Sequence, residues 1–193
     1  DVITLKGLME KLRKEHYEVR TISRSVAYDL VSRYHYARSA SNTAVYLHGL
    51  FEIGVKECLG VAWWLPPTKS AALATYPDNW QAVLALSRLV IVPGVPSNAC
   101  SFLLSRSRRL IDSAKWKCLV TYADTWQGHS GAIYRADNWE YKGMTRPERC
   151  YVRQGIMIAR KAGPKTRTHK EMLDLGCEMI GSFSKHKFVK LTR

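Results

Sequence analysis

Apolar runs of strand length alternate with helix-like segments along this 193-residue chain, and this alternation restricts its fold more than any other feature. The longest apolar run, 82–92, ends at a Pro-Gly-Val-Pro sequence. Ser97 or Asn98 then begins a helix that is predicted to reach about Lys115, and a short buried strand is predicted over 118–122. Both kinds of element are therefore expected in one domain.

The remaining segments continue the alternation. The N-terminal part is predicted to form a helix over 5–14, a strand over 17–22 and a helix that begins at Ser23 or Ser25 and ends near 34–36. A hairpin of strands 43–48 and 53–65, which turns at Gly49, is predicted next. The C-terminal part is predicted to add a helix over 131–137 and a final strand over 151–159. Together they predict a mixed α/β fold with one central sheet flanked by helices.

The charge of the chain is strongly positive and unevenly placed. Lys and Arg number 30 against 16 Asp and Glu, a formal charge of +14. Residues 160–193 are rich in cations and are predicted to form a basic C-terminal extension beyond a domain over 1–159, and a second group of cations lies at 106–117. Such an excess favours a polyanion, nucleic acid above all, over a surface that is charged only for solubility.

Several other classes of protein are excluded by composition. With 46% hydrophobic and 24% charged residues, the chain can form an ordinary core and is not a disordered basic arm. We expect neither a membrane span nor secretion, because no run of 18 apolar residues and no signal-peptide pattern is present. The five cysteines are widely spaced and include no Cys-x-x-Cys pair, which is typical of a reducing cytoplasm.

One short segment resembles a known fold. The sequence Ala132-Ile133-Tyr134, followed by Asn138-Trp139 and a strand, is similar to the late helix of the GNAT acyltransferases. In that fold a central strand splays from its neighbour and the gap receives an acyl donor, so the resemblance implies that Tyr134 is a general acid near the leaving group. The loop before the predicted helix departs from the family, because two of its residues are prolines that lack N–H donors. Ser97 and Asn98 at the helix start are still expected to bind a donor phosphate.

Three separated segments narrow the resemblance. Residues 34–39, 86–89 and 122–134 together resemble the Mom family of phage DNA-modification proteins. The family implies conversion of adenine in double-stranded DNA to an N6-carbamoylmethyl derivative, which protects phage DNA from restriction in the host cytoplasm. The donor stays open between an acyl-CoA, an aminoacyl-tRNA and another small metabolite. A conventional GNAT N-acetyltransferase acting on protein or small-molecule amines, and a non-catalytic DNA-binding protein, are the alternatives.

That chemistry suggests roles for particular residues. The exocyclic amine of adenine is a weak nucleophile, so a group that takes or orients its proton is needed. Asp124 follows a short apolar strand and is a candidate, although it could instead cap the next helix. Ser87 and Arg88 interrupt an apolar strand, and we expect Arg88 to meet a donor anion or Asp124 unless it turns to solvent.

Further residues are assigned by residue type. His35 and His129 are candidate proton shuttles, or else hydrogen-bonded structural histidines. Base flipping is expected for an enzyme that acts on a stacked base, and it needs aromatic surfaces and phosphate contacts. The residues assigned to these tasks are Tyr34, Tyr36 and Trp126 for stacking, with Tyr36 also close to the chemistry, and Arg38, Lys185 and Lys187 for DNA. Metal-free transfer is favoured, although His35, His48, Asp124 and His129 could converge on a metal.

Overall fold

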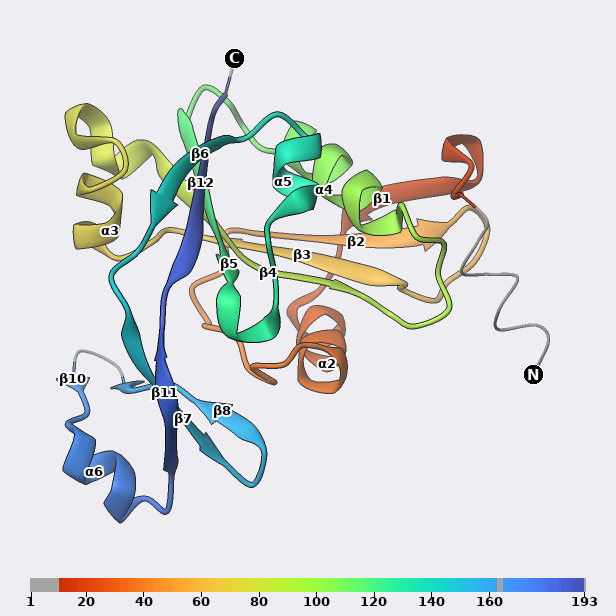
Figure 1. The fold of residues 1–193 in the computed structure, drawn as a ribbon. Helices are drawn as coiled ribbons and strands as arrows, with labels where there is room; N and C mark the ends of the chain where they lie inside the picture. The colour runs from red at the N-terminus through yellow and green to blue at the C-terminus, as the bar shows by residue number, and fades with distance from the viewer. Residues whose placement is uncertain (1–10, 163–164, 193) are drawn as a thin grey trace.

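The central feature of the fold is one twisted sheet of seven strands (Figure 1). The structure is a computed structural model, and it describes residues 11–162 and 165–192 of the chain. The strands, in spatial order, are β1 (Tyr17–Thr21), β2 (Tyr46–Glu52), β3 (Gly60–Leu65), β4 (Val83–Ile91), β5 (Cys118–Asp124), β12 (Lys185–Leu191) and β6 (Glu140–Met144). Neighbours are antiparallel except β4 and β5, which are parallel.

Helices and two smaller sheets complete the structure. The α-helices are α2 (Arg24–Tyr34), α3 (Lys69–Leu73), α4 (Ala99–Arg109), α5 (Ala132–Ala136) and α6 (His169–Asp174). Short 3-10 helices are η1 (Lys14–His16), η2 (Pro77–Ala82) and η3 (Thr125–Gln127). The smaller sheets consist of β7 (Glu148–Arg153), β8 (Ile156–Ile158) and β11 (Glu178–Phe183), and of β9 (Lys161–Ala162) and β10 (Lys165–Thr166). Within the described part of the chain, no helix combines the length and apolar composition needed to cross a membrane.

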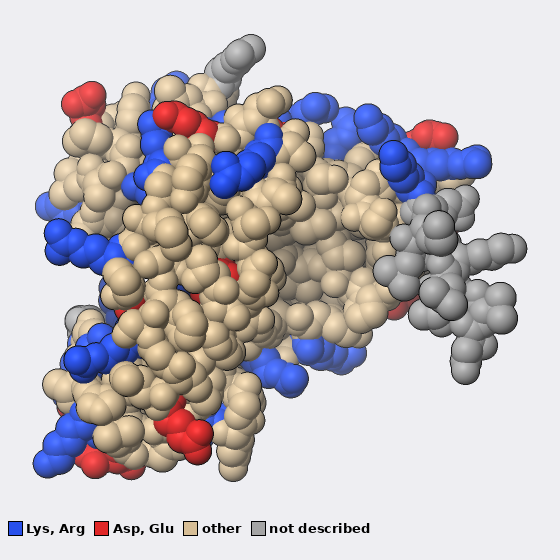
Figure 2. Space-filling view, in the orientation of Figure 1, with Lys and Arg blue, Asp and Glu red and all other residues tan. Residues whose placement is uncertain are grey.

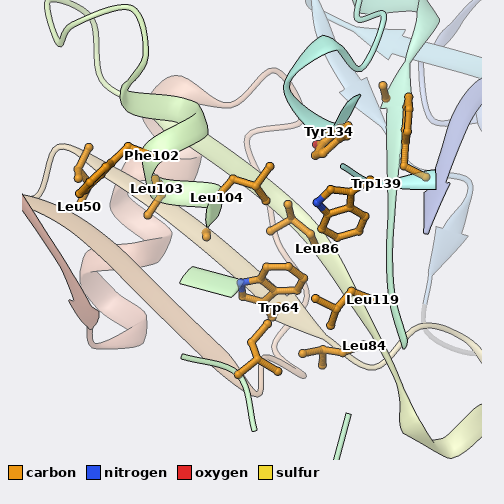
Figure 3. Close-up of a cluster of buried hydrophobic side chains, with 14 of the residues drawn as sticks. Leu50, Trp64, Leu84, Leu86, Phe102, Leu103, Leu104, Leu119, Tyr134 and Trp139 are labelled. Carbon is orange, nitrogen blue, oxygen red and sulfur yellow. The ribbon is translucent and has the colours of Figure 1, made fainter. Parts of the chain in front are cut away.

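The sheet buries both faces, as the apolar runs predict. Adjacent side chains of a strand point to opposite faces, and in β3 Trp63 packs with α2 while Trp64 packs with the leucines of α4. Figure 3 shows the α4 side, where Trp64 lies near Trp139 and Tyr134. The indole rings of Trp64 and Trp139 are stacked with centroids 6.5 Å apart. The mixed α/β fold with one flanked central sheet is confirmed.

The parallel contact between β4 and β5 is short. Only four residue pairs are in register, from Val83 with Cys118 to Leu86 with Thr121. At the last pair, the Thr121 hydroxyl donates a hydrogen bond to the Leu86 carbonyl at 3.2 Å. The pairing of β4 with β3 slips at the same point, which leaves Ser87 as the extra residue of a bulge. The two strands therefore separate beyond Leu86.

Two predictions about local structure were wrong. Gly49 does not turn the hairpin, since it lies inside β2 opposite Arg20 of β1 and Val61 of β3. A side chain there would collide with Phe51 and other neighbours, so this glycine is needed for packing. The helix expected to reach Lys115 ends at Arg109.

The predicted ends of the chain were also partly wrong. The run 151–159 forms β7 and β8 joined by a turn, and it is not the last strand. β12 is an interior strand of the central sheet, paired with β5 along seven residues and with β6 on its other side. Lys185–Leu191 is therefore no extension of the domain. Most of the helix predicted over 5–14 lies outside the described residues, and η1 begins at Lys14.

A buried polar cluster joins β2, β3 and α4. His48 is only 1% exposed, and its Nδ1 lies 2.8 Å from the Ser107 hydroxyl. The Trp64 indole N–H donates to the same hydroxyl at 2.8 Å. All three groups are satisfied when Ser107 donates its proton to an unprotonated Nδ1. Burial accordingly lowers the pKa of His48 from 6.5 to about 4.

This cluster predicts a contribution of His48 to acid sensitivity. As pH falls below about 6.5, His48 becomes protonated in the unfolded chain, whereas in the folded protein it stays neutral until the pH approaches its lowered pKa of about 4. The free energy of unfolding should thus fall by up to about 1.4 kcal/mol per pH unit in this window. His48→Asn keeps an acceptor for Ser107 and does not titrate, so urea unfolding between pH 7 and pH 4.5 should show a shallower decline. Equal slopes for the variant and the wild type would contradict this assignment.

Candidate functional site

The gap between the separated ends of β4 and β5 holds a pocket of about 380 Å³, called the site pocket below. Three segments that are distant in sequence supply nearly all of its lining. They are the residues after α2, the bulged part of β4, and the chain from the end of β5 to α5, and Cys100 of α4 is the remaining lining residue. The lining residues are His35, Tyr36, Leu86, Ser87, Arg88, Leu89, Cys100, Thr121, Tyr122, Ala123, Gly128, His129, Ser130, Gly131, Ala132, Ile133 and Tyr134. All three segments singled out in the sequence therefore meet in one cavity.

Asp124 does not line this pocket itself, although its neighbour Ala123 and its hydrogen-bond partner Tyr36 do. Its side chain is 2% exposed, and one carboxylate oxygen, Oδ2, accepts a hydrogen bond from the Tyr36 hydroxyl at 3.3 Å and pairs with the Lys185 ammonium at 3.3 Å. The other, Oδ1, accepts from the Trp126 backbone N–H at 3.2 Å and caps η3. Asp124 is thus both a helix cap and the anchor of Tyr36. Burial, together with the Asp124 charge, raises the pKa of the Tyr36 phenol, which is protonated at neutral pH.

Tyr134 occupies the boundary between core and pocket. It is 8% exposed, and its ring packs against Phe188 and Trp139 with centroids 5.3 and 5.8 Å away. Burial raises the pKa of its phenol from 10.0 to about 12, while a hydrogen bond with Thr121 acts in the opposite direction. At neutral pH the group is a proton donor that faces the cavity.

Arg88 is held at the bulge by backbone oxygens. Its Nε donates to the Ser39 carbonyl at 2.8 Å, and Nη1 donates to the Ser87 carbonyl at 2.7 Å and to the Ser87 hydroxyl at 3.2 Å. No carboxylate forms an ion pair with Arg88 among the residues that the structure describes, so the expected pairing with Asp124 is absent there. The guanidinium is therefore oriented at the pocket wall with its charge uncompensated.

The two pocket histidines differ in environment. The Nδ1 atom of His35 accepts a hydrogen bond from the Ala37 backbone N–H at 3.1 Å. Burial, and then the positive charge of Arg88, lower the pKa of His35 from 6.5 to about 3. His35 is thus neutral at pH 7 and offers an Nε2–H donor rather than a base. His129 is exposed at the rim, with its ring 6.2 Å from that of Tyr36.

Five predicted DNA contacts lie outside the pocket wall, and one of them, Lys185, pairs with Asp124 as described above. Tyr34 is 46% exposed at the end of α2, and Arg38 is exposed with a positive φ of 46°. Trp126 packs edge-on against Tyr36 at a centroid distance of 6.5 Å. The ammonium of Lys187 donates to the Ala74 carbonyl at 3.1 Å.

The expected donor-phosphate residues also serve another purpose. Asn98 precedes α4, but its side chain caps no helical N–H. Instead its Oδ1 accepts from the Leu12 backbone N–H at 2.6 Å, and its Nδ2 donates to the Leu12 carbonyl at 3.4 Å. Neither Ser97 nor Asn98 lines the site pocket.

The four residues considered for a metal do not gather at one point. His48 lies in the core with Ser107, and the other three are near the pocket. Within 11–162 and 165–192, no group of three or more His, Cys, Asp or Glu side chains is arranged to hold a metal ion.

A family comparison agrees with this arrangement. The model of the Mom protein family matches residues 16–191, nearly the whole chain. The chain belongs to the Mom protein family. No curated protein matches the sequence. The family match spans all three segments that line the site pocket, so the resemblance noted in the sequence is confirmed.

Solved structures confirm the GNAT fold. An N-acetyltransferase from Staphylococcus aureus superposes with a TM-score of 0.54 at 13% identity, covering 91% of this chain and 98% of its own. A Bacillus subtilis acetyltransferase in complex with CoA gives 0.56 at 7% identity, covering 92% and 99%. A GNAT acetyltransferase from Elizabethkingia anophelis with acetyl-CoA bound gives 0.54 at 11%, covering 92% and 99%. At these identities the likeness concerns the fold.

Coenzyme A, which two of these neighbours contain, needs a cradle for its pyrophosphate. In this chain Pro93 and Pro96 supply no N–H in the loop before α4. The side chain of Asn98 is already bonded to Leu12 on both its oxygen and its nitrogen. The loop therefore offers a pyrophosphate two backbone N–H groups fewer than a loop without proline would.

Sequence reasoning missed two parts of the site. Lys185 is the ionic partner of buried Asp124, because β12 pairs with β5 in a register that places these residues opposite one another. Gly131, at φ 76°, brings the start of α5 against the Phe188 ring. Its sequence signal was a Gly immediately before a short helix, which the prediction used only as a boundary.

The two glycines of this loop form a matched pair for a stability test. Gly128 and Gly131 both have positive φ, and only at Gly131 would an added Cβ overlap the ring of Phe188. Gly128→Ala should lower the free energy of unfolding by about 1–2 kcal/mol, which is the cost of placing a residue with a Cβ in the left-handed backbone conformation. Gly131→Ala should cost about 1–3 kcal/mol more, because the ring must move. Urea unfolding of both variants measures the difference, and equal losses would show that the ring contact is unimportant.

Proposed function

We propose that this protein modifies DNA by converting adenine N6 in double-stranded DNA to its N6-carbamoylmethyl derivative, which protects phage DNA from restriction in the cytoplasm of the infected host. The supporting observation is that the three Mom-like segments, far apart in sequence, line one pocket at the strand gap of a GNAT fold. The substrate is then a flipped adenine, and the second substrate is an activated donor of the two-carbon unit.

The transfer forms one bond and breaks one. The N6 lone pair attacks the donor carbon that carries the leaving group, and the bond between that carbon and the leaving group breaks. Tyr134, a protonated phenol facing the pocket, gives its proton to the departing group. The N6 proton passes to the Tyr36 oxygen as the Tyr36 hydroxyl gives its own proton to Asp124, with which it is hydrogen-bonded.

Two other groups favour the charged transition state. Arg88 stabilises negative charge that develops on the donor, because its guanidinium has no acidic partner among the described side chains. His35 offers a neutral N–H donor toward the same cavity. Asp124 acts through Tyr36 and is a positioning residue and proton acceptor that does not touch the base.

The alternatives predict different products. A conventional acetyltransferase would modify protein or small-molecule amines, and a DNA-binding protein would leave DNA unchanged. The two prolines in the loop before α4 count against the first, and the hydrogen bond between Tyr36, in the pocket wall, and the buried Asp124 counts against the second.

The product test is direct. DNA from bacterial cells that express the folded chain should yield, after enzymatic digestion and mass spectrometry, a nucleoside heavier than deoxyadenosine by one carbamoylmethyl group. DNA from cells with an empty vector is the control. Unmodified deoxyadenosine alone, despite abundant folded protein, would refute the proposed function.

Three conservative variants test the assigned roles. Tyr134→Phe, Tyr36→Phe and Asp124→Asn each remove a proton donor or acceptor while keeping shape, and each should reduce the modified nucleoside at least about 100-fold. Tyr28→Phe, on the exposed side of α2, should be neutral. Quantification of the modified nucleoside with a thermal unfolding control measures the effect. Near-normal product from any one of the three would remove that residue from the mechanism.

A further inference from the structure

A second cavity, called the basic groove below, lies between the central sheet and the sheet of β7, β8 and β11. It has a volume of about 380 Å³ and shares two lining residues, Tyr36 and Arg88, with the site pocket. Its other charged lining residues are Arg149, Arg160, Lys161 and Lys185, with Glu148 as the acid. The two cavities therefore meet at Tyr36, one of them strongly cationic.

Most of the positive charge in the basic groove is uncompensated. Among the described residues, none of Arg149, Arg160 and Lys161 makes an ion pair. Arg160 is oriented by its Nε, which donates to the Arg167 carbonyl at 3.0 Å. Lys185 differs, because its ammonium pairs with Asp124. A row of cations without acidic partners is the electrostatic pattern that phosphates recognise.

We propose that the basic groove binds the phosphates of the DNA strand that carries the target adenine, so that the flipped base reaches Tyr36 from the groove. This inference rests on the proposed DNA modification. A base leaves the stack by rotation about its own backbone, so its flanking phosphates must lie beside the pocket that receives it. The ring of Tyr36, with the His35 ring at 4.3 Å and the Trp126 ring at 6.5 Å, gives the extruded base an aromatic surface there.

The location of the groove matters more than the total charge. In Figure 2, Lys and Arg side chains lie mainly around the outline of the face shown, and its centre is largely uncharged. The competing cationic surface follows α4 and the loop after it, with Arg106, Arg109 and Lys115. Cavities beside α4 share no lining residue with the site pocket. DNA bound there would have no described cavity leading to Tyr36.

Salt dependence of binding separates the two surfaces. The groove variant Arg149→Gln/Arg160→Gln/Lys161→Gln and the control variant Arg106→Gln/Arg109→Gln/Lys115→Gln lose the same charge. Each lost phosphate contact lowers the slope of log affinity against log salt by about 0.9 on duplex DNA. We expect the groove variant to lose between about 1 and 3 in slope by fluorescence anisotropy, and the control to lose clearly less. Equal losses, or a larger loss for the control, would overturn the assignment.

Additional variants and a second nucleic acid make the binding experiment decisive. If the triple variant does not fold, the single variants Arg149→Gln and Lys161→Gln, both on exposed side chains, should each lose up to about 0.9 in slope. If the groove variant binds bulk transfer RNA more weakly but keeps its slope on duplex DNA, the groove is an RNA site and the proposal is wrong. Modified adenine in cells together with an unchanged slope would refute the groove alone, whereas a reduced slope without any modified adenine would refute the proposed function alone.

Discussion

The short parallel contact between β4 and β5 is the constraint on which the site depends. After four residue pairs the strands part, and their backbone groups beyond this point need other partners. At the bulge, the Ser87 carbonyl accepts a hydrogen bond from the Arg88 guanidinium. At the last pair in register, the Thr121 hydroxyl donates to the Leu86 carbonyl. The cavity thus opens where the parallel pairing stops, and its wall includes Ser87 and Arg88 of β4 and Thr121 and Tyr122 of β5.

A buried carboxylate beside that gap requires compensation from elsewhere in the chain. An isolated charge with the 2% exposure of Asp124 would be costly, and removal of one partner of such a pair is usually destabilising. Lys185 and the Tyr36 hydroxyl supply the compensation from opposite ends of the sequence. The pair therefore links the insertion of β12 to the placement of Tyr36, so the last strand of the fold and the site cannot be assembled independently.

The sequence predicted the mixed α/β fold and the three segments that meet at the pocket, whereas the roles assigned to the site residues stay predictions. His35, Arg88 and Tyr134 all line the pocket. Their positions were predictable because each lies within or just after a predicted strand or helix, where local sequence patterns are informative. The Lys185–Asp124 pair was not predictable, because it depends on the register between strands 61 residues apart in sequence. Asn98 was misread for the same kind of reason, since its partner Leu12 is 86 residues away and no local pattern shows that the cap side chain is already used.

The basic C-terminal residues show why formal charge overstates the surface available to a polyanion. Within β12, the ammonium of Lys187 donates to the carbonyl of Ala74, which is the C-cap residue of α3. The ammonium of Lys190 donates to the carbonyl of Asp137, which is the C-cap residue of α5. Carbonyls at helix ends carry partial negative charge and favour such cations. These lysines stabilise the ends of two helices and Lys185 stabilises Asp124, so three cations of one strand are used by the fold itself. On the proposed function, phosphate recognition would depend on cations without acidic partners. Those that line the basic groove with Tyr36 are Arg88 of β4 and three residues in or near β7 to β9, namely Arg149, Arg160 and Lys161.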